Sequence, residues 1–119
     1  MAEILCVDDS KLQKQLLVKY LKSLGHNTKE ADNGAKALEL IGDDYLPDVI
    51  FTDLLMPEMD GFSLIEAINK KGVNIPTIIL STHIYNAMEK RGKELGIIGF
   101  VKKPFQFGEI KESLDQALS

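Results

Sequence analysis

Apolar residues along this chain alternate between short continuous runs and longer stretches of wider spacing. Four runs end abruptly in charged or hydroxyl side chains, at residues 4–9, 49–53, 77–81 and 99–104. A run of this length between turn residues is typical of a strand that is buried on both faces of a sheet. A more polar segment, Asn27–Ala31, predicts one further short strand.

Between the predicted strands, apolar residues recur at the three- and four-residue spacing of an amphipathic helix. The first predicted helix ends at Gly25, and its apolar stripe consists of Leu12, Leu16, Leu17, Leu21 and Leu24. Four more helices are predicted, one that follows Asn33-Gly34 and reaches Ile41, and three over residues 61–69, 84–95 and 108–118.

Five strands that alternate with five helices predict an α/β fold. Connections this short require right-handed crossovers, which place helices on both faces of a parallel sheet. We therefore predict a doubly wound five-stranded parallel sheet covered by five helices. The carboxyl ends of its strands would meet at one edge, where such folds bind ligands.

Composition limits the classes of function that remain. A length of 119 residues with 45% hydrophobic residues predicts one domain over residues 1–119. The net charge of −4 argues against direct binding of nucleic acid, which needs clustered Lys and Arg. Cys6 is the single cysteine and lies in an apolar run, so we expect a reduced thiol. With neither a secretion signal nor a membrane span in the sequence, we expect a cytoplasmic protein.

The adjacent acids Asp8 and Asp9 follow the first predicted strand and precede a helix. An Asp, or the following Ser10, is a favoured helix N-cap, so capping is one explanation. Capping does not need two carboxylates, however, and a third, Asp53, ends another predicted strand. Carboxylates that lie close together repel one another unless a cation offsets them, and hard oxygen donors suit Mg²⁺. We therefore predict Mg²⁺ as the cofactor.

Asp53 and Lys103 suggest the chemistry of the site. A lone Asp after a strand is usually a turn former, but an ionised carboxylate beside Mg²⁺ is a competent nucleophile toward a phosphoryl group. A lysine at the end of a buried strand is costly without an anionic partner, so Lys103 is expected to pair with the acids or with a phosphoryl group. A cis peptide bond before Pro104 would aim Lys103 inward. Ser81 either bonds to a loop or offers its hydroxyl to the site.

Taken together, these residues resemble the receiver domain of two-component response regulators, in the single-domain form of chemotaxis regulators. The resemblance runs from Ile4 to about Leu118, and its motifs are Asp8-Asp9, Asp53 with Met56-Pro57-Glu58-Met59-Asp60-Gly61, the strand Pro76–Ser81, and Phe100–Phe105 with its Lys-Pro. It implies a flavodoxin-like sheet with the strand order 2-1-3-4-5.

The resemblance also implies a role for each site residue. Asp53 would accept a phosphoryl group from the phosphohistidine of a sensor histidine kinase or a phosphotransfer protein. Asp9 would ligate Mg²⁺ directly, Asp8 would help through water, and Asp53 and the backbone carbonyl of Leu55 would complete the protein ligands. The domain would be no enzyme in the usual sense, because it assists the phosphorylation and dephosphorylation of its own residue.

A conformational switch is implied as well. Ser81 and Lys103 would stabilise the phosphoryl group, and Phe100 would rotate inward when Ser81 moves toward it. The fourth helix, fifth strand and fifth helix would then contact a downstream target protein. Candidate residues on this surface are Tyr85, Lys90, Phe100 and Phe107. A plain core aromatic is the alternative reading of Phe100.

Three positions depart from the pattern or vary within it. Thr82 stands where many relatives have a small Ala or Gly, which would narrow the access of the phosphoryl group. Leu55 and His83 fall at positions that tune the lifetime of the phosphoryl group in the family. An apolar Leu55 cannot position an attacking water, which favours a longer-lived state, whereas the loops and His83 could reverse that effect, so the lifetime stays open.

The sequence therefore predicts an Mg²⁺-dependent phosphorylation switch. The alternative from the binding class is a receiver-like adaptor that interacts without being phosphorylated, although it would have no need of all five residues Asp8, Asp9, Asp53, Ser81 and Lys103. A phosphatase with an aspartyl nucleophile is disfavoured, since Asp8 and Asp9 lack a one-residue separation and no cap excludes water. A flavin site is disfavoured because acids replace the expected phosphate cradle.

Overall fold

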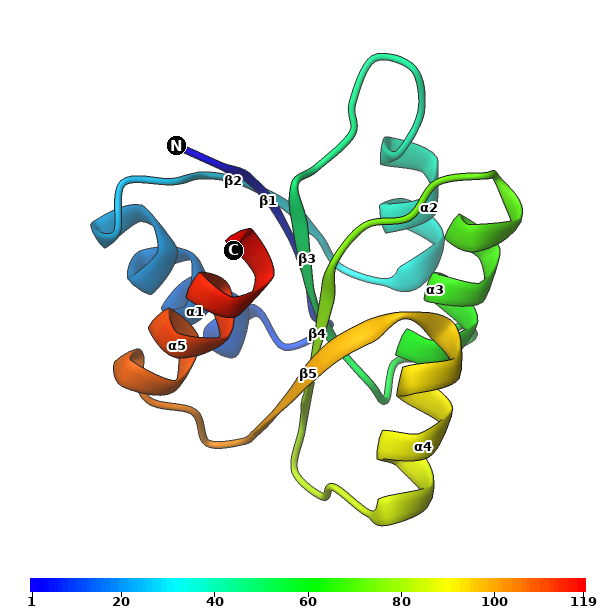
Figure 1. The fold of residues 1–119 in the computed structure, drawn as a ribbon. Helices are drawn as coiled ribbons and strands as arrows, with labels where there is room; N and C mark the ends of the chain where they lie inside the picture. The colour runs from blue at the N-terminus through cyan, green and yellow to red at the C-terminus, as the bar shows by residue number, and fades with distance from the viewer.

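A computed structural model describes all residues from 1 to 119. Its single sheet has five parallel strands in the order β2-β1-β3-β4-β5 (Figure 1). The strands are β1 (Glu3–Val7), β2 (Asn27–Ala31), β3 (Val49–Asp53), β4 (Thr77–Ser81) and β5 (Ile97–Lys102). The predicted fold class and strand order are confirmed.

Five helices cover the two faces of this sheet. They are α1 (Lys11–Ser23), α2 (Gly34–Leu40), α3 (Gly61–Lys70), α4 (Asn86–Leu95) and α5 (Phe107–Leu118). Figure 1 shows α1 and α5 together on one face, and α2, α3 and α4 on the other. None of the helices is both long and apolar enough to span a lipid bilayer.

The central strand β3 is buried on both faces, which explains its continuous run of apolar residues. Successive side chains of a strand point to opposite faces. Phe51 packs in the core layer that contains α1 and α5, whereas its neighbour Ile50 packs in the layer that contains α2 and α3. All five residues of β3 are buried, so both faces of the strand require apolar or fully bonded side chains.

Polar caps place three helix starts near the carboxyl edge of the sheet. The side chains of Ser10, Asn33 and Asp60 accept hydrogen bonds from backbone N–H groups in the first turns of α1, α2 and α3. Such caps satisfy N–H groups that have no partner within the helix. The loop that carries Asp8 and Asp9 and the loop that follows Asp53 are therefore each held by a strand at one end and by a capped helix at the other.

The predicted apolar stripe of α1 was wrong in its first half. Leu12 is 79% exposed and Leu16 is 38% exposed, whereas Lys14 is buried. The buried face instead runs through Lys14, Leu17, Val18 and Leu21. Its first member is polar because the ammonium of Lys14 bonds to the backbone carbonyl of the buried Asp8 and to the carboxylate of the exposed Asp32.

Two predicted boundaries also shift. Helix α4 begins at Asn86 rather than at residue 84, because Tyr85 has extended backbone angles and is the N-cap. Strand β5 begins at Ile97, two residues before the predicted run, and ends at Lys102. Gly99 hid the start of this strand in the sequence, since a glycine lowers the strand signal.

Candidate functional site

Three carboxylates meet at the carboxyl edge of the sheet. Asp8 and Asp9 follow β1 directly, and Asp53 is the last residue of the neighbouring strand β3. One carboxylate oxygen from each residue lies within 4.8 Å of the other two. The parallel pairing of β1 and β3 thus brings residues more than forty positions apart into one cluster.

Lys103 reaches this cluster from the loop after β5. Its ammonium nitrogen lies 3.1 Å from Asp8 Oδ2 and 3.1 Å from Asp53 Oδ1. The lysine side chain is only 6% exposed, so the two ion pairs are largely shielded from solvent. The Lys103–Pro104 peptide bond is cis. The structure therefore brings Lys103 together with the acids, as the sequence predicts.

The two adjacent acids differ in their surroundings. Asp8 is buried, and its Oδ1 accepts a hydrogen bond of 2.8 Å from the N–H of Ser10. The N–H of Asp8 donates to the carbonyl of Ala31 at 3.2 Å. Asp9 is exposed. Asp8 is thus fixed within the protein, whereas the carboxylate of Asp9 is open to an incoming ligand.

The environment of Asp53 raises its pKa above the ordinary value for Asp. Burial is the largest cause, because it disfavours the charged form. Lys103 acts in the opposite direction by stabilising the carboxylate, and Asp8 and Asp9 add to the rise by repulsion. A cation bound between the carboxylates would therefore favour ionised Asp53.

Replacing Asp53 by Asn is expected to stabilise the metal-free protein at neutral pH. Because the folded state raises the pKa of Asp53, its contribution to stability is greatest below the ordinary Asp pKa and is lost as pH rises through the raised value. The difference in unfolding free energy between the variant and the parent should grow over this range. Urea titrations in a metal chelator at several pH values measure it, and a constant difference would contradict the account.

Ser81 ends β4, beside β5, and its hydroxyl bonds to a loop. The hydroxyl donates to the carbonyl of His83 at 2.8 Å and accepts from the N–H of His83 at 3.3 Å. Phe100 in β5 is partly buried, and its ring meets that of Phe62 edge-on with 6.5 Å between centroids. In this structure Ser81 therefore bonds to a loop, and Phe100 packs as an aromatic side chain against its neighbours.

Gly61 lies directly against the backbone of Asp53. Its N–H donates to the carbonyl of Leu54 at 2.8 Å. A Cβ atom at position 61 would lie 2.8 Å from the carbonyl oxygen of Asp53, closer than real Cβ atoms approach. The glycine of the motif is therefore required by the close approach of α3 to the end of β3.

The residues present suit a hard divalent cation. The donor set consists of carboxylate oxygens, and one of the three acids is exposed, so coordinated waters can be retained as Mg²⁺ prefers. Leu55 follows Asp53 by two residues, and its side chain is 72% exposed. Thr82 and His83 are also exposed at this edge of the sheet.

Lys14 is a residue of this region that the sequence analysis missed. Its ammonium donates to the carbonyl of Asp8 at 3.3 Å and forms an ion pair with Asp32. The signal was present in the spacing, since Lys14, Leu17, Val18 and Leu21 follow the i, i+3, i+4, i+7 pattern of a buried helix face. The leucines at positions 12 and 16 drew the predicted stripe away from it.

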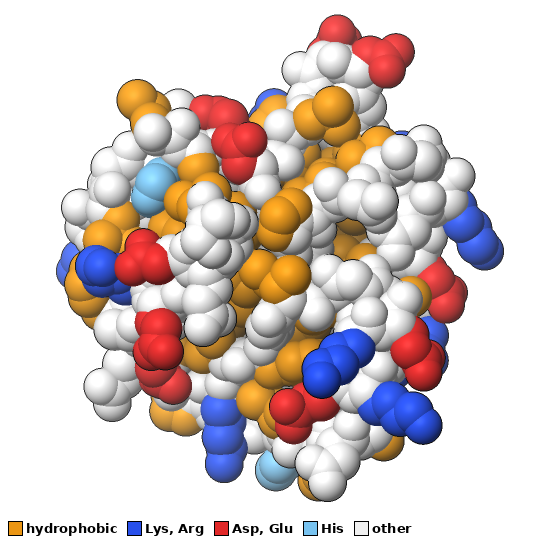
Figure 2. Space-filling view, in the orientation of Figure 1, with side chains coloured by type: hydrophobic (Ala, Val, Ile, Leu, Met, Phe, Trp, Pro, Cys, Tyr) orange, Lys and Arg blue, Asp and Glu red, His pale blue; other side chains and the backbone are white.

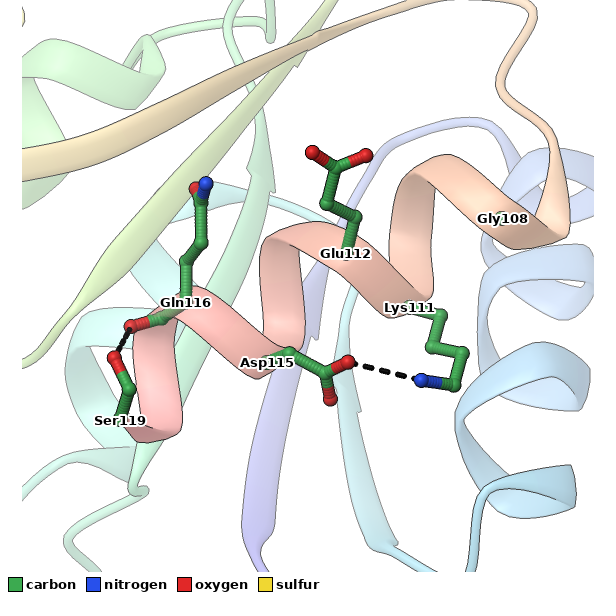
Figure 3. A pocket seen from close by; sticks show the side chains of 6 residues that line it. All are labelled: Gly108, Lys111, Glu112, Asp115, Gln116 and Ser119. Carbon is green, nitrogen blue, oxygen red and sulfur yellow. Dashed lines mark hydrogen bonds and ion pairs between the residues drawn. The ribbon is translucent and has the colours of Figure 1, made fainter.

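A shallow depression of about 400 Å³ on α5 offers no comparable chemistry (Figure 3). The one lysine that lines it already pairs with a neighbouring acid, in the 2.9 Å contact between Lys111 and Asp115. Ser119 donates to the carbonyl of Gln116. The depression is lined by Gly108, Lys111, Glu112, Asp115, Gln116 and Ser119. The acid cluster thus remains the candidate site.

Comparison with known families agrees with this geometry. The model of the response regulator receiver domain matches residues 4–115. The chain therefore belongs to the response regulator receiver domain family. Receiver domains are the phosphoacceptor signalling domains of two-component phosphorelays and are not classical enzymes.

Some relatives are much longer proteins, and this chain matches only a part of each. The sensor histidine kinase CheAY of Helicobacter pylori is 34% identical over 105 residues, which make up 86% of this chain and 13% of that protein. The sensor histidine kinase RcsC of Escherichia coli is 32% identical over 111 residues, 93% of this chain and 12% of RcsC. This chain thus spans about an eighth of the length of these relatives.

Solved structures of similar size match over nearly the whole chain. The chemotaxis protein CheY4 of Vibrio cholerae has a TM-score of 0.91 at 29% identity, with 98% of both chains covered. The receiver domain of the Francisella response regulator 1452 has a TM-score of 0.88 at 31% identity, with 99% of this chain and 98% of that chain covered.

Proposed function

We propose that residues 1–119 form one receiver domain whose Asp53 accepts a phosphoryl group in an Mg²⁺-dependent reaction. The donor is the phosphohistidine of a sensor histidine kinase or a phosphotransfer protein. The observation that carries the proposal is the cluster of Asp8, Asp9 and Asp53 with the buried ammonium of Lys103 between two of them. A structural ion-pair network would not need the third, exposed acid at Asp9.

The transfer is a substitution at phosphorus. A carboxylate oxygen of Asp53 forms the new bond to phosphorus, and the bond to the histidine nitrogen breaks with its electron pair remaining on nitrogen. Lys103, which already lies 3.1 Å from Asp53 Oδ1, pairs with the added negative charge. The domain supplies these groups itself, so it assists its own phosphorylation and dephosphorylation.

The metal site of the proposal uses Asp8, Asp9, Asp53 and the backbone carbonyl of Leu55. When bound, Mg²⁺ offsets the carboxylates and the charge of the phosphoryl oxygens. The open carboxylate of Asp9 makes it the direct ligand. Asp8 acts through water, because its own oxygens are bonded to Lys103 and to the N–H of Ser10.

Phosphorylation changes the surface through Ser81 and Phe100. The hydroxyl of Ser81 leaves the carbonyl of His83 and donates to a phosphoryl oxygen. The ring of Phe100 then turns inward from its contact with Phe62. A methyl group at Gly92 would lie 2.7 Å from this ring, so the position of the ring in this structure depends on that glycine.

The changed surface comprises α4, β5 and α5, and a downstream protein binds there. Three of its candidate contact residues are exposed, namely Lys90, Tyr85 by 61% and Phe107 by 39%. On the face shown in Figure 2, Lys and Arg side chains lie singly among Asp and Glu rather than in one basic patch. This distribution and the net charge of −4 favour a protein partner over nucleic acid or a membrane.

We further propose a cytoplasmic location. Cys6 is fully buried, and burial raises the pKa of its thiol to about 12, so the thiol stays protonated and unreactive. A single thiol without a disulfide partner suits a reducing compartment.

Intact-mass measurement after incubation with Mg²⁺ and a small acyl phosphate tests the proposed function. We expect one phosphoryl adduct on the parent, none on Asp53→Asn, and none on the parent when a chelator removes the metal. The Asn side chain is isosteric with Asp but is no nucleophile, so this variant is a matched control.

Each remaining outcome supports another class of protein. No adduct on the parent with Mg²⁺ present would support an adaptor that works without phosphorylation. Sustained release of phosphate from an unrelated phosphate ester would support a phosphatase. An equal adduct on Asp53→Asn would place the acceptor elsewhere.

A further inference from the structure

Lys14 is a buried cation that the proposed reaction does not use. Its side chain is 5% exposed, and the ammonium contacts Asp32 and the backbone carbonyl of Asp8, the latter at 3.3 Å. Asp32 follows β2 and is 65% exposed. The lysine therefore bridges the loop after β1 and the loop after β2.

A lysine is an expensive residue at this position. Lys14 shares the buried face of α1 with Leu17, Val18 and Leu21. An apolar side chain would pack there without the cost of removing an ammonium from water. The bonds that the ammonium makes, rather than packing, therefore account for a lysine at this position.

The contact with Asp8 completes the bonding of that residue. The N–H of Asp8 donates to Ala31, Oδ1 accepts from Ser10, and Oδ2 pairs with Lys103. The backbone carbonyl is the remaining polar group, and Lys14 donates to it. This carbonyl belongs to the planar peptide unit that joins Asp8 to Asp9, so holding the oxygen fixes the direction in which the chain enters Asp9.

We propose that Lys14 is a positioning residue for the divalent cation, because it clamps the Asp8–Asp9 peptide and thereby aims the exposed carboxylate of Asp9. The proposal rests on the metal site of the proposed function. Lys14 and Asp32 carry opposite charges, so the pair adds no net charge near the acids, and its effect is one of geometry. The hydrogen bond from Lys14 also holds the pKa of Asp32 below its ordinary value, which keeps the pair ionised.

A charge-neutral double variant, Lys14→Met with Asp32→Asn, isolates this geometric effect. It removes the clamp and leaves the net charge unchanged. We expect its Kd for Mg²⁺, measured by titration calorimetry, to rise about three- to tenfold, the range for the loss of one hydrogen bond. Lys14→Arg should restore a Kd within about twofold of the parent, because guanidinium can also bridge a carbonyl and a carboxylate.

A control on the same helix separates positioning from general loss of stability. Val18→Ala removes buried apolar atoms one turn further along α1 and should lower the unfolding midpoint without changing the Kd. The proposal is overturned if the double variant binds Mg²⁺ within twofold of the parent, or if Val18→Ala weakens binding equally. If the parent itself binds no Mg²⁺, this inference and the metal site both fail. If the parent binds Mg²⁺ but Asp53 is never phosphorylated, only the proposed function fails.

Discussion

Replacing Lys103 by Met is expected to lower the unfolding free energy of the metal-free protein at neutral pH by about 3–5 kcal/mol, the usual cost of removing one partner from a buried ion pair. The variant leaves Asp8 and Asp53 buried without the cation that lies 3.1 Å from each. Mg²⁺ should restore much of the loss, because the metal offsets the same carboxylates. Urea denaturation with and without Mg²⁺ measures both effects.

The neighbouring Lys102 provides a matched control. It is exposed, so Lys102→Met removes the same charge from the chain without uncovering a buried pair. Its effect should stay within about 0.5 kcal/mol, as for most surface substitutions. Equal losses in the two variants would mean that net charge, rather than the pairing of Lys103 with the acids, accounts for the result.

Gly61→Ala is expected to slow phosphorylation of Asp53 more than about tenfold, because small displacements of reacting groups are costly in rate. It should also destabilise the protein by about 1–3 kcal/mol, the usual range for overpacking. The new Cβ would lie 2.8 Å from the carbonyl oxygen of Asp53, and a main-chain atom cannot turn aside as a flexible side chain can. Either β3 or α3 must therefore shift. Phosphorylation rates at saturating Mg²⁺ and thermal unfolding measure the two effects.

Gly108→Ala is the corresponding control in another helix. No atom lies within 4 Å of a Cβ built at position 108, so the substitution adds helix propensity without a clash. We expect unchanged phosphorylation and slightly higher stability. A normal phosphorylation rate in Gly61→Ala would show that the close approach at Gly61 does not position Asp53.

The sequence predicted most of the fold because buried parallel strands leave a strong local signal. The runs before Asp53 and Ser81 are buried on both faces, and their lengths agree with β3 and β4 residue for residue. Strand β2 was also predicted with the bounds that the structure has, Asn27–Ala31, although its composition is more polar. The order of the strands is not a local property, and it came from the resemblance to a known family.

The candidate site was predictable where it depended on strand ends. Asp8 and Asp53 lie at the ends of the paired strands β1 and β3, so the parallel sheet brings them together, whereas Lys103 follows β5 and reaches them across the end of β4. Lys14 was missed because the leucines at positions 12 and 16 suggested another stripe, and because its polar partners, Asp8 and Asp32, lie beside it only in the folded chain. Periodicity marks a position as buried but does not show that its partner is polar.

The same limit applies to the switch. The sequence placed Ser81 and Phe100 at the right strands but could not distinguish a hydroxyl that bonds to a loop from one that faces the acids. The structure has the first arrangement, with the hydroxyl on the carbonyl of His83. The proposed change on phosphorylation therefore begins from a defined arrangement. Movement of the hydroxyl can be followed at the N–H of His83, which donates to the same oxygen.

The most direct test of the central claim is to locate the phosphoryl group. Hydride reduction of an acyl phosphate releases phosphate and converts the acid to an alcohol, so a phosphorylated Asp becomes homoserine, which peptide sequencing by mass spectrometry detects. After treatment with Mg²⁺ and an acyl phosphate, we predict homoserine at position 53 alone, and none when a chelator is present. Homoserine at another position, or none with Mg²⁺ present, would contradict the account.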